Sequence, residues 1–333
     1  MVSKQEEAGL VRARVSFGAQ EEYRVLIEEN EVPAAPSGKL RAFGELPAVG
    51  DWVRVRLVGE FGLIEEVEPR RTAFVRKAAG RTSDSQCVAA NVDVAFVVCG
   101  LDGDFNLRRL ERYLVLAWES GALPVVVLNK ADVCGDLAGA VNAVGEVAGE
   151  AEVVVISARQ SVEPLWTWLV PSATAVLVGS SGAGKSTIAS ALGAGELATQ
   201  EVRLNDSRGR HTTTNRMLVL LPNGAALIDT PGMRELGLVA REDSLALGFP
   251  EIGEHAVRCR FADCGHDAEP GCAVRAAIEA GAIESARWAS YVKLQREARH
   301  NAMALDRPAQ LAEKQRWKAI HKAQKKMYRE RGR

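Results

Sequence analysis

Short polar motifs follow the predicted strands of one α/β segment, and this pattern constrains the fold more than any other feature. Apolar runs predict strands over Pro124–Leu128, Val153–Ile156 and Ala173–Val178. The residues that follow these strands are Asn129-Lys130-Ala131-Asp132, Ser157-Ala158 and Gly179-Ser180-Ser181-Gly182-Ala183-Gly184-Lys185-Ser186-Thr187. In open α/β sheets, ligands collect at the carboxyl ends of the strands. The sequence therefore predicts such a sheet, with one ligand site along its edge.

The third motif has the spacing of a phosphate loop. It joins a predicted strand to a helix predicted over Ser186–Leu192. Its glycines allow backbone N–H groups to surround phosphates, and the helix N-terminus adds positive partial charge. We expect Lys185 to reach the β- and γ-phosphates and the Ser186 hydroxyl to bind Mg²⁺. The alternative, a chance glycine-rich turn, is disfavoured by the strand–loop–helix context.

The first two motifs predict selection of guanine. The Asp132 carboxylate can accept hydrogen bonds from guanine N1–H and the exocyclic amine, which adenine does not offer in that arrangement. We expect Asn129 to brace the loop and the base edge, and the Lys130 stem to pack on the ring. The Ala158 N–H, after Ser157, is expected to bond the guanine oxygen. Each motif alone is common, and their joint occurrence at strand ends makes them informative.

Two later motifs are candidates for sensing the γ-phosphate. A strand over Ala225–Ile228 leads into Asp229-Thr230-Pro231-Gly232, where Asp229 is expected to hold Mg²⁺ and the Gly232 N–H to meet the γ-phosphate. The polar stretch Asn205–Asn215 contains a candidate switch. Its residues are Gly209-Arg210-His211-Thr212-Thr213-Thr214. We favour Thr213 as the Mg²⁺ ligand, although spacing does not choose among the threonines and a plain strand start is the alternative.

The residue after this aspartate motif is Met233, where many GTPases carry a glutamine that positions water. Methionine cannot orient a nucleophile, so His211 becomes the candidate for polarising the water. A surface histidine in a loop is the alternative for His211. A further expectation is slow intrinsic turnover unless a partner orders the loop.

The order of the motifs is rearranged. An ordinary GTPase presents the phosphate loop, the switch threonine, DxxG, NKxD and SA in that order, whereas here the last two come first. This arrangement predicts a circular permutation of one domain, which we place at residues 81–238. The permutation puts the switches at the end of the domain, so Asp229–Leu236 leads directly into the C-terminal residues.

The N-terminal residues 1–80 predict a small β domain. Strands are expected over Leu10–Phe17, Tyr23–Glu28, Asp51–Leu57 and Leu63–Val67. Turn formers, including the Pro33–Gly38 stretch, separate them. We favour an OB-fold barrel over a sandwich or a generic β domain without a ligand. A polar linker is expected over Thr82–Asn91.

Residues 239–333 predict a mostly helical, zinc-binding domain. Three cysteines and a histidine fall within fourteen residues, at Cys259, Cys264, His266 and Cys272. Such a Cys₃His set suits a closed, structural Zn²⁺ site, since a catalytic zinc would keep one position open. Unrelated free cysteines are the alternative. The site would stabilise a small domain that otherwise buries little core.

The C-terminal residues are strongly basic. From Ala286 to Arg333 there are 14 Lys and Arg against 4 Asp and Glu, although the whole chain has a net charge of only −1. Trp317 and Tyr328 are interleaved with the basic residues after a helix expected over Ser285–Leu305. Basic and aromatic side chains together suit RNA, through phosphate attraction and base stacking. A solvated basic helix end is the alternative.

Together these motifs resemble the RsgA (YjeQ) family of circularly permuted GTPases, over nearly the whole chain. The GRHTTT motif and the Cys-x4-Cys-x-His-x5-Cys spacing are more specific than the phosphate loop. The resemblance implies an OB-fold, a GTPase domain and a zinc domain. It also implies late maturation of the small ribosomal subunit, contact with its rRNA, and hydrolysis of a phosphoric anhydride of GTP that this subunit stimulates. We expect a monomer that alternates between GTP and GDP and couples GTP state to rRNA binding.

Three other functions are alternatives for this chain. The chain is alternatively an RNA-binding module with GTP as a static ligand and incidental hydrolysis. A permuted GTPase of the large subunit is disfavoured by the flanking barrel and zinc regions, and an ATPase by Asp132. The acidic N-terminus has no apolar core of a signal peptide, and no apolar run approaches the ~18 residues that span a bilayer. We therefore expect a cytoplasmic protein with no membrane partner.

Overall fold

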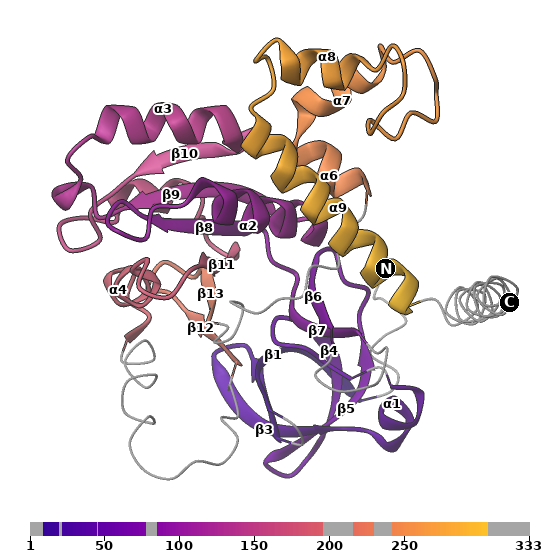
Figure 1. The fold of residues 1–333 in the computed structure, drawn as a ribbon. Coiled ribbons are helices and arrows are strands. Elements are labelled where there is room, and N and C mark those ends of the chain that lie inside the picture. Colours follow the sequence, from indigo (N-terminus) through magenta and orange to yellow (C-terminus); the bar gives the residue numbers. More distant parts are fainter. Residues whose placement is uncertain are drawn as a thin grey trace, which may run out of the picture.

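The computed structural model describes residues 9–19, 22–44, 46–77, 85–195, 216–229 and 242–305. Three parts follow one another along the chain: a β-barrel, an α/β sheet layer and a helical region (Figure 1). In the view of Figure 1 the barrel lies below the α/β layer, and α7 and α8 lie above it. This confirms the predicted fold class, while the exact borders of the domains remain predictions.

The N-terminal strands close into a five-stranded barrel. The strand order is β1-β2-β3-β5-β4, and β4 pairs back onto β1 from Trp52↔Arg14 to Arg56↔Leu10. Inward side chains such as Val15, Val25 and Ile64 are fully buried, as alternation along a closed sheet requires. The predicted OB-fold is confirmed. Its elements are β1 (Leu10–Ala19), β2 (Glu22–Ile27), β3 (Asn30–Pro36), α1 (Gly38–Phe43), β4 (Trp52–Val58) and β5 (Phe61–Val67).

Two expectations about connecting segments were wrong. The Pro33–Gly38 stretch was expected to be a turn, but Pro33 and Ala34 lie in β3, which pairs with β2 and, in parallel, with β5. Both prolines are tolerated because each pairs on one side only, Pro33 with β2 and Pro36 with β5. The expected linker Thr82–Asn91 contains β7 (Ser85–Ala90), which pairs with β6 (Ala73–Lys77). Its small apolar residues Val88, Ala89 and Ala90 are buried. The polar residues earlier in the segment made its composition resemble that of a linker and hid this strand.

The central sheet has helices on both faces. Its order is β10-β9-β8-β11-β13-β12, all parallel except the β13–β12 pair. One face packs against α2 and α3, and the other against α4, with separate clusters of buried residues on each side. The elements are β8 (Val94–Gly100), α2 (Leu107–Ser120), β9 (Leu123–Asn129), α3 (Leu137–Ala148), β10 (Glu152–Val155), β11 (Thr174–Gly179), α4 (Lys185–Ala191), β12 (Arg216–Leu220) and β13 (Ala226–Asp229).

The barrel and the central sheet are hydrogen-bonded into one eleven-stranded sheet, because β12 pairs with β1 at Phe17↔Met217. A buried arginine, Arg14, reinforces this junction. Its guanidinium donates to Thr174 Oγ1 at 2.6 Å and to the Gly50 carbonyl at 3.4 Å. Gly50 has φ +91°, and a Cβ there would lie 2.2 Å from the Ala90 carbonyl oxygen, so only glycine fits.

The C-terminal helices share a core with the α/β layer. Buried Phe249, Ile252 and Leu294 belong to the same hydrophobic cluster as Leu114 of α2. The elements are α6 (Glu242–Gly248), α7 (Pro250–Ala256), α8 (Ala273–Glu279) and α9 (Ser285–Leu305), the last with the bounds that the sequence predicts. In the part of the chain that the structure describes, we find no helix with the length and apolar character needed to cross a membrane.

Candidate nucleotide site and metal centre

The motif-bearing strands end level with one another. Gly100 of β8 is paired with Asn129 of β9, and Gly179 of β11 is paired with Val98 of β8. On the other side of β9, the end of β10 pairs at Val155↔Leu128. The guanine motif (Asn129–Asp132), the Ser157-Ala158 motif and the phosphate loop are therefore brought to one edge of the sheet, as the sequence predicts.

Asn129 connects all three motifs. Its side-chain amide donates to the Ala183 carbonyl in the phosphate loop at 2.9 Å, and its Oδ1 accepts from the Ala158 N–H at 3.0 Å. Asn129 is buried, so these bonds are shielded from water. Gly184 lies against it, with φ +98°, and a Cβ at Gly184 would meet the Asn129 amide nitrogen at 2.2 Å. The backbone thus approaches Asn129 more closely than any side chain would allow.

The phosphate loop is arranged around the amine of Lys185. The Lys185 Nζ donates to the carbonyl of Gly179 at 2.9 Å and to that of Ser180 at 2.6 Å. Ala183 is buried under the loop, whereas Ser181 and Gly182 are exposed. Ser186 and Thr187 are exposed in the first turn of α4, and no side chain caps this helix at Gly184. Backbone N–H groups of that turn have no partner within the helix, which suits an anion.

The guanine motif turns sharply after Asn129. Lys130 has a left-handed backbone at φ +68°, and Ala131 to Val133 form a 3₁₀ turn that leaves Asp132 exposed. The Ala131 N–H donates to the Ile156 carbonyl at 3.2 Å, which ties the motif to the Ser157-Ala158 loop. The Ser157 hydroxyl is buried and has no hydrogen-bond partner among the described residues. A buried orphan hydroxyl beside these motifs is consistent with a ligand site.

Sequence reasoning missed two carboxylates at this edge. Asp102 pairs with the Lys130 ammonium, and Asp104 accepts from the Ser180 hydroxyl and from Arg109 Nη1 at 2.6 Å. The pKa of Asp102 is lowered, chiefly by the hydrogen bond from Lys130. The available signal was positional, since both residues follow β8, which lies between two motif-bearing strands.

Several expected site residues lie outside the described residues. These are His211 and Thr213 of the candidate switch, and Thr230 to Gly232. Asp229 is described only as the last residue of β13, paired with Met217 of β12. Because β13 lies next to β11, Asp229 ends one strand away from the phosphate loop.

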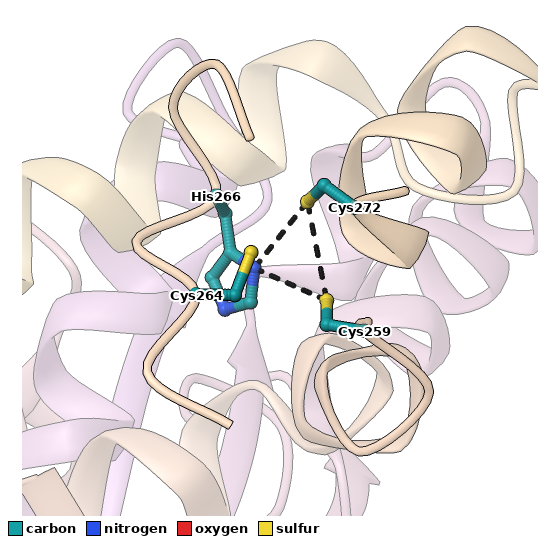
Figure 2. A group of neighbouring side chains, drawn as sticks. All are labelled: Cys259, Cys264, His266 and Cys272. Carbon is teal, nitrogen blue, oxygen red and sulfur yellow. Dashed lines mark hydrogen bonds between the residues drawn. The ribbon is translucent and has the colours of Figure 1, made fainter. Parts of the chain in front are cut away.

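The four predicted metal ligands converge in the helical region. The ligand atoms of Cys259, Cys264, His266 and Cys272 all lie within 4.8 Å of one another, as Figure 2 shows. His266 Nδ1 is 3.5 Å from the Sγ atoms of Cys259 and Cys272, which are 4.0 Å apart. Tetrahedral zinc with ordinary bond lengths implies S···N of about 3.5 Å and S···S of about 3.8 Å. The donor set therefore fits a closed metal site.

The metal-ligand loop is held by its own polar contacts. The Glu269 carboxylate accepts from the N–H groups of Gly265 at 2.9 Å and Asp267 at 2.8 Å. The His266 ring packs edge-on to Trp288 of α9, with ring centroids 6.1 Å apart. Burial opposes ionisation of Cys259, but hydrogen bonds from backbone N–H groups and from the neighbouring thiols outweigh it and lower the pKa of that thiol. Burial instead raises the pKa of the neighbouring Cys264 thiol to about 11, so without a metal the cluster favours one thiolate at Cys259. The lowered pKa of Cys259 favours the thiolate form in which a cysteine binds a metal.

Comparisons with known proteins agree with this geometry. The family model described as RsgA GTPase matches residues 67–239. The small ribosomal subunit biogenesis GTPase RsgA of Opitutus terrae is 46% identical over 339 residues, covering 96% of this chain and 92% of that protein. A protein of the same name from Leptospira interrogans is 41% identical over 332 residues, covering 98% and 92%.

Two solved structures share the fold. The crystal structure of YjeQ from Thermotoga maritima aligns with a TM-score of 0.66 and 28% identity, covering 87% of this chain and 98% of that one. YloQ, described as a circularly permuted GTPase, aligns with a TM-score of 0.64 at 23% identity, covering 90% and 98%, and supports the fold alone. With a family model spanning over half of its length and relatives matched almost end to end, the chain belongs to the RsgA family of circularly permuted GTPases.

Proposed function

We propose that this protein hydrolyses GTP as a late assembly factor of the small ribosomal subunit, which stimulates the hydrolysis. The names of its near-full-length relatives support the biological role. The observation that carries the chemistry is Asn129, which joins the guanine motif to the phosphate loop and to Ala158. That connection brings together motifs whose order along the chain the permutation has changed.

We propose specific roles for the residues of this pocket. Asp132, exposed on its 3₁₀ turn, binds the guanine edge, and Lys130 covers the ring. Lys185 exchanges the loop carbonyls for phosphate oxygens when GTP binds. Mg²⁺ supplies charge neutralisation at the β- and γ-phosphates, and we assign Ser186, Thr213 and Asp229 to hold it. His211 positions the attacking water, and the Gly232 N–H meets the γ-phosphate.

The remaining proposals concern the flanking regions. The Cys₃His cluster holds one structural Zn²⁺, which the interatomic distances support. The basic C-terminal residues contact rRNA, and the protein acts as a monomer in the cytoplasm. Loss of the γ-phosphate changes rRNA affinity, because the segment after Asp229 leads directly into the helical region.

Co-sedimentation tests this proposal directly. The full-length protein is mixed with purified small or large subunits, together with a non-hydrolysable GTP analogue, GDP or no nucleotide. We expect pelleting with small subunits that is strongest with the GTP analogue. Equal pelleting with both subunits would rule out small-subunit specificity, and equal pelleting with GTP analogue and GDP would rule out the coupling.

A further inference from the structure

The loop between β8 and α2 contacts both halves of the candidate nucleotide site. Its residues Asp102 and Asp104 place one carboxylate on the guanine motif and one on the phosphate loop. We propose that both are positioning residues for the nucleotide: Asp102 sets the Lys130 side chain for the base, and Asp104 sets the phosphate loop for the phosphates. This inference rests on the proposed guanine-nucleotide site and adds a segment that lies outside the sequence motifs of that site.

The loop itself is fixed at both ends. The Leu101 N–H donates to the carbonyl of Asn129 at 2.8 Å, so the loop begins on the residue that joins the motifs. The Asp104 N–H donates to Asp102 Oδ1 at 3.3 Å, and Asn106 caps α2 through the Arg109 N–H at 3.0 Å. A short loop anchored in this way holds its carboxylates in place without a large entropic cost on binding.

Asp104 acts on the second residue of the phosphate loop. The Ser180 side chain is buried, and its hydroxyl donates to Asp104 Oδ2. Asp104 Oδ1 accepts from Arg109 Nη1 at 2.6 Å, so the carboxylate is itself held. The Ser180 carbonyl meanwhile accepts from Lys185 Nζ at 2.6 Å. Ser180 is thus fixed through its side chain and its backbone, and the N–H groups that follow it are preorganised for phosphate.

Asp102 acts on the guanine motif. Lys130 follows β9 with a left-handed backbone, and its ammonium pairs with Asp102 Oδ2. The two side chains are 30% and 35% exposed, so the pair is partly screened by water. We expect a modest contribution from Asp102, exerted on the base rather than on the phosphates.

If the two carboxylates acted on the nucleotide only through their charge, removing one would have the opposite effect on affinity. Two carboxylates near a polyphosphate would repel it, so removing one should tighten binding. Asp104, however, is paired with Arg109 at hydrogen-bond distance, and a charge pair so close has a weak field at the phosphates. Positioning therefore outweighs repulsion, and removing the carboxylate should weaken binding.

The test measures binding of guanosine and GDP to the full-length protein by displacement of a fluorescent GDP analogue. Guanosine reports on the base alone, and the ratio of the two affinities reports on the phosphates. We expect Asp104→Ala to weaken GDP about tenfold and leave guanosine unchanged. Asp102→Ala should weaken both ligands about threefold and leave their ratio unchanged.

A second pair of variants isolates the Asp104 contact. Ser180→Ala keeps the Asp104–Arg109 ion pair and should lose as much GDP affinity as Asp104→Ala does. The double variant should lose no more than either single variant, because both remove one interaction. Glu146→Ala, at an exposed acid on α3 of the same domain, is the matched control and should bind as the wild type does. Thermal melts confirm that each variant is folded.

The outcomes separate the two proposals. A wild-type protein that binds no guanine nucleotide refutes the proposed function and this inference with it. A wild type that binds GDP, with Asp104→Ala and Ser180→Ala equal to it or tighter, overturns the positioning role while the proposed function stands. Additive losses in the double variant also overturn the Asp104–Ser180 contact.

Discussion

The guanidinium of Arg287 in α9 lies 2.9 Å from the carboxylate of Glu111 in α2, and both side chains are buried. Arg287 also donates to Glu251 of α7 at 2.6 Å and to the Gly248 carbonyl at 2.9 Å. One arginine therefore joins the helical region to the GTPase domain and satisfies acceptors on three helices.

Replacing this arginine should destabilise the protein strongly. Arg287→Met leaves the Glu111 carboxylate buried with one cation less, which costs about 3 kcal/mol in the free energy of unfolding. Urea denaturation at neutral pH measures this change. The control is Arg56→Ala in the barrel, whose ion pair with Glu65 at 3.1 Å is exposed, and which should cost about 0.5 kcal/mol or less. Equal stability of the two variants would contradict a structural role for the buried pair.

The metal centre should be required for the helical region. We expect one zinc per wild-type chain by elemental analysis, and none in Cys272→Ser, which loses a buried ligand. The variant should also show a lower melting temperature, because the ligand loop is no longer closed. Cys134→Ser changes a cysteine outside the cluster and should keep its zinc. Zinc retained at full stoichiometry in Cys272→Ser would argue against the Cys₃His assignment.

Guanine selectivity should depend on Asp132. In Asp132→Asn the amide can no longer accept two hydrogen bonds from the base, so GDP affinity should fall about 100-fold. Xanthosine diphosphate should bind more tightly, because its second carbonyl accepts from the new amide. Isothermal titration with both nucleotides measures the exchange. Asp136→Asn serves as control, since Asn caps α3 as well as Asp does. If Asp132→Asn left GDP affinity unchanged, Asp132 would not be the residue that binds the guanine base.

The junction of barrel and sheet should depend on the Thr174 hydroxyl. Thr174→Val keeps the shape but leaves the Arg14 guanidinium without its acceptor at 2.6 Å. Burial already lowers the pKa of Arg14 to about 10, which marks the cost of desolvating this cation. We expect a loss of about 2 kcal/mol in unfolding free energy, measured in urea. Thr167→Val, at an exposed threonine, should leave the free energy of unfolding unchanged. Equal unfolding free energies for the two variants would contradict a stabilising role for the Arg14–Thr174 hydrogen bond.

Much of the fold follows from local patterns in the sequence. Several strands of the central sheet are nearly continuous apolar runs, and a motif follows each of β9, β10 and β11, so these three strands were predictable. The bounds of α9, Ser285–Leu305, also match the helix expected from the sequence. The ligand set of the metal centre is predictable because its four residues are close in sequence and chemically distinctive.

What the sequence did not provide is long-range pairing. β3 contains two prolines and becomes a strand only because β2 and β5 pair with it. Arg14 and Thr174 are 160 residues apart, and nothing local connects them. Asp104 and Ser180 are likewise joined only by the parallel alignment of β8 with β11. Such contacts arise from topology, and a single sequence does not state them.

The central claim is that the small ribosomal subunit stimulates GTP hydrolysis at the permuted guanine-nucleotide site. Multiple-turnover hydrolysis tests this claim most directly. Phosphate release is measured for the full-length protein with GTP or ATP, alone and with purified small or large subunits. The account predicts slow GTP hydrolysis alone, at least about tenfold faster hydrolysis with small subunits, and no such gain with large subunits or ATP. An unchanged GTP rate with small subunits, or equal use of ATP, would contradict it.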